Sequence, residues 1–159
     1  MVIDPGTGFK DIVRLLSSEG VIDQPLVFSA ITMAQGNQYK LKAGEYSFAA
    51  AMTPRQVADK LLKGEVVIHT LTIPEGLITE DIVKALQSDP YLTGPIPGNI
   101  GEGELLPETY FFTRGESRAK IVSQMRENMK KTLEALWASR QEALPLKNMR
   151  EAVILASIV

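Results

Sequence analysis

A fourteen-residue segment near the start of the chain returns seventy positions later, and this internal echo constrains the fold more than any other feature. Residues 3–16 read IDPGTGFKDIVRLL, and residues 73–86 read IPEGLITEDIVKAL. Six of the fourteen paired positions are identical, and Arg14 and Lys84 keep the positive charge. Self-similarity at a fixed offset indicates a repeated supersecondary unit. We therefore expect related β-α units in series in the first half of the chain.

Each copy has a short turn followed by apolar residues three and four positions apart, which is typical of an amphipathic helix. A looser third copy spans residues 53–62. There Thr53 is suited to cap the helix N-terminus, Pro54 suits the first helical position, and Gly64 is expected to end the helix. Strand-like runs over residues 39–48 and 66–73 lie between the copies, and the second is rich in β-branched residues.

A segment rich in proline and glycine, residues 88–103, predicts a loop between domains. It divides the chain into an N-terminal β-α region, residues 1–87, and a second domain, residues 88–159. The mixture of β-α units and later helices predicts an α+β fold.

Two further helices are expected in the second domain. Ser117 is a suitable cap for a helix that runs to about Arg140, and Asn148 is a suitable cap for a final helix. Glu151 should reach back to the backbone N–H of Asn148. Residues 152–159 read AVILASIV, which is apolar almost all round and predicts burial in a core. We therefore expect the natural protein to continue beyond this run.

Composition excludes several classes of function. The formal net charge is −2, from 17 basic and 19 acidic side chains, so the basic surface of a nucleic-acid-binding protein is not expected. The chain has no cysteine and one histidine, His69, so we expect no zinc site built from protein ligands. We interpret His69 as a structural or surface residue, and we expect no metal and no cofactor.

Four motifs now resemble one family. Residues 102–110 read EGELLPETY, which is similar to the EGxLxP[DE]TY signature of the MltG (YceG-like) endolytic murein transglycosylases. Residues 155–159 read LASIV and resemble the start of the LASIVEKE helix of that family. The segments LKAGEY, residues 41–46, and TIPEG, residues 72–76, match in order and spacing.

The resemblance implies a lyase of cell wall biogenesis on the periplasmic face of the bacterial inner membrane, held there by an N-terminal helix. It implies LysM-like units followed by a catalytic domain, peptidoglycan glycan strands as substrate, and cell-wall synthases as further partners. The enzyme would cleave between N-acetylmuramic acid and N-acetylglucosamine and leave a 1,6-anhydro end. The catalytic glutamate of the family would follow Val159 directly, so we expect this fragment to be truncated before that residue and inactive.

The same resemblance suggests the substrate-binding residues. Glu102 and Tyr110 are expected on the wall of the sugar cleft, together with Leu106, Pro107 and Glu108 of the same signature. Glu102, Glu104 and Glu108 could also suggest a carboxylate pair. Loop carboxylates are usually solvated, however, and we do not expect them to catalyse the reaction.

Two alternative functions remain open at this point. The first is a non-catalytic peptidoglycan-binding module, in which the LysM-like part carries the function. The second is a pyridoxal-phosphate-dependent aminodeoxychorismate lyase, a label that relatives of this family sometimes carry. The sequence does not favour the lyase, because it has no phosphate-binding Gly/Ser turn and no lysine in a setting typical of a Schiff base.

Overall fold

The computed structural model describes residues 1–141 and 144–158, and the chain divides into two compact units, Met1–Ile68 and His69–Val159. This division differs from the predicted boundary at residue 87. The predicted N-terminal domain includes most of helix α4 (Thr79–Ser88), whereas Ile82 and Leu86 on this helix are buried in the core of the second unit.

The first unit contains the elements β1 (Val2–Ile3), α1 (Phe9–Ser18), α2 (Pro25–Ala34), β2 (Gly44–Glu45) and α3 (Pro54–Lys63). The two short strands pair antiparallel, with Ile3 opposite Gly44. Its core consists of buried side chains from all three helices and from the strands: Ile3, Ile12, Leu16, Ile22, Phe28, Tyr46, Val57, Ala58 and Leu61.

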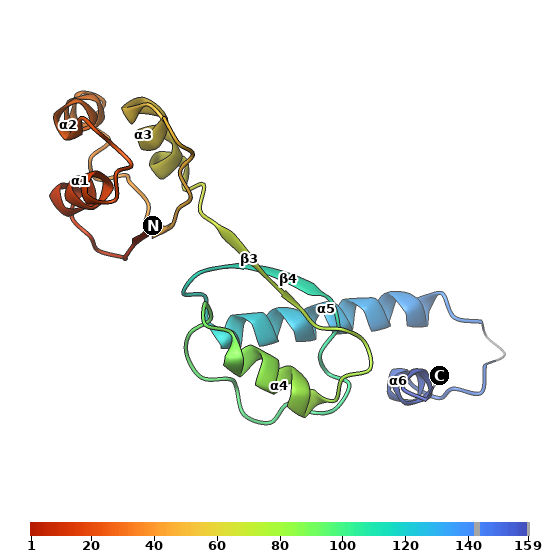
Figure 1. Cartoon of the computed structure of the whole chain (residues 1–159). Coiled ribbons are helices and arrows are strands. Elements are labelled where there is room, and N and C mark those ends of the chain that lie inside the picture. Colours follow the sequence, from red (N-terminus) through yellow and green to blue (C-terminus); the bar gives the residue numbers. More distant parts are fainter. Residues whose placement is uncertain (142–143, 159) are drawn as a thin grey trace. The chain divides into compact units, whose positions relative to one another are not determined.

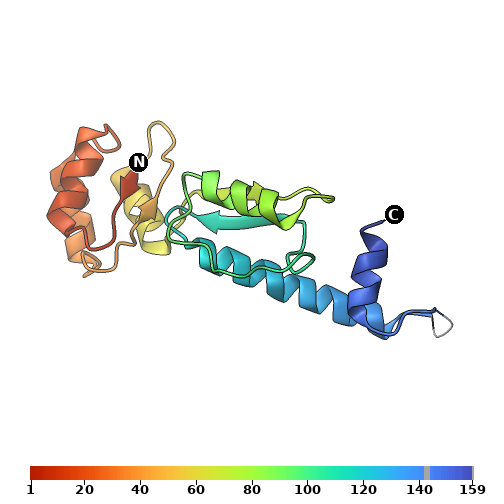
Figure 2. The same cartoon turned by 90° about the horizontal axis from the view of Figure 1, so that it is seen from below.

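The second unit contains β3 (Ile68–Thr72), apart from its first residue, and α4, β4 (Thr109–Thr113), α5 (Arg118–Ala138) and α6 (Met149–Ala156). Strands β3 and β4 form a two-stranded antiparallel sheet that lies beside α4 and α5 (Figures 1 and 2). Its core comprises Ile73, Ile82, Leu86, Leu92, Leu105, Tyr110, Phe112, Ile121, Val122 and Met125. Among the described residues, no helix is long and apolar enough to cross a membrane.

The structure confirms the echo that the sequence predicted. Helix α1 begins at Phe9 and α4 begins seventy positions later at Thr79. In the turns before them, Gly6 and Gly76 have φ angles of 86° and 83°, a left-handed conformation that glycine adopts without strain. The apolar partners Ile3 and Ile73 are both buried, as are the matching pairs Ile12 and Ile82, and Leu16 and Leu86.

The repeat extends further in the structure, at an offset of 64 residues. Tyr46 and Tyr110 are both buried, and each donates its hydroxyl to the carbonyl four residues earlier, at 2.8 and 2.7 Å. Thr53 and Ser117 are the N-caps of α3 and α5. The predicted third copy, residues 53–62, therefore corresponds to the start of α5 and not to residues 3–16.

Backbone contacts agree with this correspondence. The N–H of Lys42 donates to the carbonyl of Leu61 at 3.1 Å, and the N–H of Leu106 donates to that of Met125 at 3.4 Å. Both units thus place a strand and its tyrosine against the helix that follows. The change of offset from 70 to 64 shows that the segment between the first helix and the second strand is six residues longer in the first unit, where it includes α2.

Most helix termini lie where the sequence predicted them. Thr53 forms a capping box with Gln56, and Gly64 ends α3 with a φ of 74°. The side chain of Ser117 accepts a hydrogen bond from the N–H of Lys120. The strands are shorter than predicted: residues 39–48 contribute only the two residues of β2, and residues 66–73 contribute β3.

Helix α6 departs from its prediction in the hydrogen bond that Glu151 accepts. Asn148 caps the helix, but Glu151 accepts a hydrogen bond from the N–H of Lys147 at 2.7 Å and not from that of Asn148. The described part of the run is largely exposed in this chain, since Ile154 and Leu155 are about half exposed and Ile158 is 76% exposed; burial of the run in a longer protein stays a prediction. The physical reason for the exposure is that α6 contacts the rest of the unit along one side only. Val159 lies outside the described residues.

Candidate functional site

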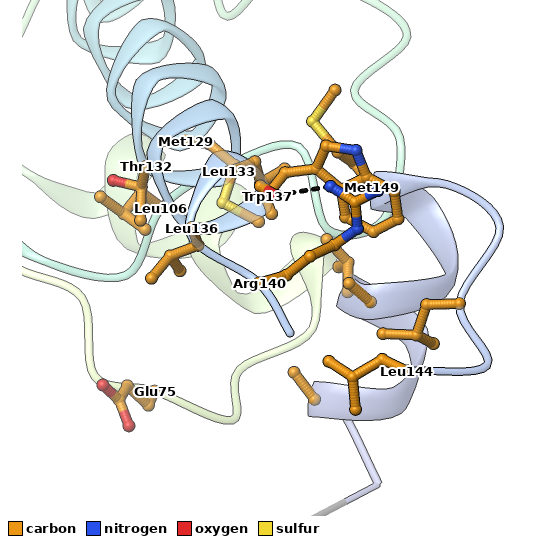
Figure 3. A pocket seen from close by; sticks show the side chains of 14 residues that line it. Glu75, Leu106, Met129, Thr132, Leu133, Leu136, Trp137, Arg140, Leu144 and Met149 are labelled. Atoms are coloured by element: carbon orange, nitrogen blue, oxygen red, sulfur yellow. Dashed lines mark hydrogen bonds between the residues drawn. The ribbon is translucent and has the colours of Figure 1, made fainter. Parts of the chain in front are cut away.

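A cavity of about 500 Å³ lies in the second unit between α5 and α6 (Figure 3). One part of its wall comes from the second half of α5, and another from residues 144–149 and α6. The turn after β3 contributes Glu75, and the loop before β4 contributes Leu106.

Three of the motif segments meet at this cavity. Glu75 belongs to TIPEG, Leu106 belongs to EGELLPETY, and Ala156 belongs to LASIV. Because these residues are far apart in the sequence, folding is what brings the segments together. Clefts that collect distant motif residues are the usual places for a binding or active site.

The wall is mainly hydrocarbon with a few polar groups, which is how ligand sites are commonly built. The apolar residues are Leu106, Met129, Leu133, Leu136, Trp137, Leu144, Leu146, Met149, Ala152, Val153 and Ala156. The polar residues are Glu75, Thr132 and Arg140. The guanidinium of Arg140 lies 4.0 Å from the ring centre of Trp137 and donates to the Trp137 carbonyl at 2.8 Å, so this cation is held by the helix (Figure 3).

The predicted residue Glu102 lies away from this wall and stabilises α4. Its two carboxylate oxygens accept hydrogen bonds from the backbone N–H of Thr79, the first residue of that helix, at 3.2 and 3.0 Å. A carboxylate is favourable at a helix N-terminus because the first N–H groups have no partner within the helix. Glu102 thus ties the signature loop to the turn that carries Glu75.

Glu104 fixes the same loop to α5. Its carboxylate forms an ion pair with Arg126 at 2.8 Å, and Arg126 also donates to the carbonyl of Asn99 at 2.9 Å. Both side chains line a second hollow of about 460 Å³ that shares Met129, Leu133 and Met149 with the main cavity. Leu105, between Glu104 and Leu106, is buried in the core.

The comparison with protein families decides which family this chain represents. The model of the YceG-like family matches residues 1–159. The chain belongs to the YceG-like family. MltG belongs to the same family, whose members are generally similar to endolytic transglycosylases, so the resemblance found in the motifs is confirmed.

A solved structure similar to the chain is that of a YceG-like protein from Listeria monocytogenes. It is 24% identical with a TM-score of 0.45, and the match covers 86% of this chain and 55% of that one. The chain therefore spans about half the length of that relative. A comparison with curated proteins gives no match.

Tyr110 of the YceG-like chain lies inside the core rather than at the cavity. It is 2% exposed, and its hydroxyl donates to the carbonyl of Leu106 at 2.7 Å. Burial raises the pKa of Tyr110 to about 12, and the nearby carboxylate of Glu108 adds to the increase. The tyrosine therefore holds Leu106 in place, next to the half-buried Pro107.

Glu108 is exposed, and its backbone carbonyl accepts a hydrogen bond from the N–H of Ile73 at 3.0 Å. Of the five residues predicted to bind substrate, Leu106 lines the cavity, whereas Glu102, Pro107, Glu108 and Tyr110 are not among its lining residues. The role of the YceG-like signature in this structure is mainly to shape the loop that carries Leu106.

Gly103 brings the signature loop against α6. Its φ is 77°, and a Cβ placed on it would come within 2.9 Å of Cγ1 of Val153. Glycine is required here both for the backbone conformation and for the close approach. This contact and the contacts with α5 position α6 at the cavity.

The sequence indicated the TIPEG motif but not the position of Glu75 at a cavity. That position follows from the antiparallel pairing of β3 with β4, which places the turn after β3 beside the loop before β4. His69, interpreted as structural, is half-buried and stacks on Tyr91 with 3.8 Å between ring centres. Within the described residues, no group of three acidic, histidine or cysteine side chains could hold a metal ion.

Proposed function

We propose that this protein is a lytic transglycosylase and that the cavity between α5 and α6 forms part of its glycan cleft. Family membership supports the reaction class. The location of the glycan cleft is supported by one observation: Glu75, Leu106 and Ala156 line the same cavity. The proposed substrate is the glycan strand of peptidoglycan, cleaved between N-acetylmuramic acid and N-acetylglucosamine.

A reaction of this kind needs one carboxyl group. The acid protonates the glycosidic oxygen of the leaving sugar, and the resulting carboxylate then takes the proton of the C6 hydroxyl. That hydroxyl attacks C1 of its own ring and closes the 1,6-anhydro product. No water is activated, so the second carboxylate of an inverting hydrolase is not required.

We propose that a glutamate directly after Val159 supplies this acid, as in the LASIVE motif of the family. A carboxyl group there would lie at the end of α6, whose residues Ala152, Val153 and Ala156 contribute apolar wall to the cavity. An apolar setting raises the pKa of a carboxyl group and keeps it protonated near neutral pH. The 159-residue chain would then bind glycan without cleaving it.

Localisation and partners follow the same proposal. The protein would work on the periplasmic face of the inner membrane, close to cell-wall synthases, and LysM-like β-α units in the first unit would add affinity for glycan. The second candidate function is a peptidoglycan-binding module without catalysis. The separate hydrophobic core of the first unit favours this alternative, because such a unit can bind independently of the cavity.

Product analysis tests the proposal. Purified sacculi are incubated with the 159-residue chain and with the protein translated from the whole gene, and the soluble products are identified by mass spectrometry. We expect 1,6-anhydromuropeptides from the whole protein and none from the 159 residues. Release by the short chain would contradict the assignment of the acid, and release by neither would favour the binding module.

A further inference from the structure

We propose that Glu75 is a substrate-binding residue, whose carboxylate accepts hydrogen bonds from the hydroxyl or acetamido N–H groups of an N-acetylated sugar in the cavity. This inference rests on the proposed function, because it takes the glycan strand as the occupant. It adds a residue outside the EGELLPETY signature to the glycan cleft.

The backbone around Glu75 is held on both sides. Ile73, two residues earlier, is buried, and its N–H donates to the carbonyl of Glu108 at 3.0 Å. Gly76, directly after Glu75, completes the turn with a φ of 83°. Leu77 then packs against the core of the second unit. The turn is therefore anchored, and it presents Glu75 at the cavity wall (Figure 3).

The repeat supplies an internal control for the role of this carboxylate. The turn of the first unit has Pro5 at the position of Glu75 and Gly6 at the position of Gly76. The two glycines have nearly the same φ, and residues 1–10 and 71–80 share the same order of buried, half-buried and exposed positions. The turn consequently forms without a carboxylate. Packing gives no reason for a glutamate at residue 75.

The carboxylate of Glu75 is also available to a ligand. Among the described residues, no hydrogen bond or ion pair engages its side chain, which is exposed. Arg140, the other charged residue among the described residues of the wall, is held by the ring and the carbonyl of Trp137. Of the described residues that line the cavity, Glu75 is thus the one that offers a free charged acceptor beside a large hydrocarbon surface.

This combination matches an N-acetylated sugar. Such a sugar has apolar ring and methyl faces, which suit the leucine and methionine side chains of the wall, and it has hydroxyl and amide donors at its edges. A hydrogen bond to a charged acceptor is about twice as strong as one between neutral groups. Glu75 would therefore fix the orientation of the sugar within a wall that otherwise gives little directionality.

Calorimetric titration of the 159-residue chain with a tetramer of N-acetylglucosamine tests the inference. We expect Glu75→Ala to weaken binding about 10-fold, as loss of a charge-assisted hydrogen bond implies, and Glu75→Gln to be intermediate because an amide oxygen still accepts. The control is Glu80→Gln, which removes an exposed carboxylate from α4 that pairs with Lys84 at 2.9 Å. Its affinity should remain within twofold of the unsubstituted chain.

Thermal unfolding of the same variants separates binding from folding. We expect the midpoint of Glu75→Ala to match that of the unsubstituted chain, because the turn of the first unit forms with a proline at this position. If the unsubstituted chain binds the tetramer and both variants at residue 75 bind equally well, the inference is wrong and the proposed function stands. If the unsubstituted chain binds neither the tetramer nor sacculi, the proposed glycan cleft and this inference both fail.

Discussion

At the scale of single residues, one buried tyrosine in each unit holds the backbone that leads into the second strand. The hydroxyls of Tyr46 and Tyr110 each donate to a carbonyl four residues earlier, of Lys42 and Leu106. A buried hydroxyl without a partner would be costly, and these bonds avoid that cost. In the second unit the tyrosine determines where Leu106 meets the cavity, so a core residue controls the shape of the site.

Replacing Tyr110 by phenylalanine should destabilise the second unit. The ring remains buried, but the carbonyl of Leu106 loses its hydroxyl donor, which costs about 1–3 kcal/mol when the acceptor stays away from water. Chemical denaturation monitored by circular dichroism measures the change in the free energy of unfolding. Tyr39→Phe is the matched control, because Tyr39 is 88% exposed and should leave the free energy unchanged.

The raised pKa of Tyr110 also predicts a dependence on pH. The folded value is about 12, and the ordinary value is 10.0. The folded state holds the proton of the Tyr110 hydroxyl more tightly than the unfolded state does. The contribution of this hydroxyl to stability is therefore complete below pH 10 and is lost as the pH rises towards 12. We expect the difference in stability between the parent chain and Tyr110→Phe to shrink over that range. A difference that stays constant from pH 9 to 12 would contradict this.

Contacts between elements depend on a few residues that the sequence alone does not reveal. Arg118, the first residue of α5, donates to the carbonyls of Leu86, Gln87 and Asp89 at 2.7–3.2 Å and so satisfies the end of α4. At the matching position the first unit has Pro54, which has no such donor. The two units therefore share a plan of elements but secure their helices in different ways.

Replacing Arg118 by methionine should loosen the end of α4. The substitution retains most of the hydrocarbon stem and removes the donors to the three carbonyls, so we expect a loss of about 2 kcal/mol. Hydrogen exchange should show faster exchange of the last amides of α4. Lys120→Met is the control, because its partner Glu116 lies outside α4; equal effects of the two substitutions would contradict the role of Arg118.

Gly103→Ala should displace α6 from the signature loop. Alanine at a φ of 77° is strained, and its Cβ would lie within 2.9 Å of Val153, so we expect a loss of about 1–3 kcal/mol. Gly98→Ala is the matched control, because nothing lies within 4 Å of its Cβ position. NMR chemical shifts of the α6 backbone measure the displacement. If they change no more in Gly103→Ala than in Gly98→Ala, the close approach of Gly103 to Val153 is contradicted.

The sequence predicted helix termini better than strands and tertiary contacts. The caps Thr53, Ser117 and Asn148 were predictable because a cap depends on residues within one turn. The two-residue strand β2 was not, because its limits depend on a partner some forty positions away. The position of Glu75 at the cavity likewise required the pairing of β3 with β4. The surface that covers α6 was not predictable either, because apolar composition does not specify which surface covers a helix.

At the scale of the whole 159-residue chain, two units with separate cores share a common plan. The strand–turn–helix segment, the second strand with its tyrosine and the following helix recur in the same order, with equivalent buried positions. The differences between the units are therefore informative about function. The second unit has a glutamate in its first turn, and its helix α5 is longer than the matching helix α3 of the first unit; both features contribute to the cavity.

The exposed apolar residues of the second unit predict self-association. Leu136, Ile154, Leu155 and Ile158 are each at least half exposed, and apolar surface of this kind favours association when it is contiguous. We expect the sedimentation coefficient to rise with protein concentration, and the double substitution Leu155→Lys and Ile158→Lys to suppress the rise. Concentration-independent sedimentation of the unsubstituted chain would contradict this prediction.

Methyl NMR of the 159-residue chain during titration with N-acetylglucosamine tetramer tests the central claim most directly. The account predicts that the methyl signals of Leu106, Leu133 and Met149, which line the cavity, shift with a single dissociation constant. Any shift of signals from the core of the first unit, such as Val57 and Leu61, should follow a separate dissociation constant, because the proposed LysM-like units bind glycan independently of the cavity. Shifts confined to the first unit would contradict a glycan cleft in the second unit and favour the binding module.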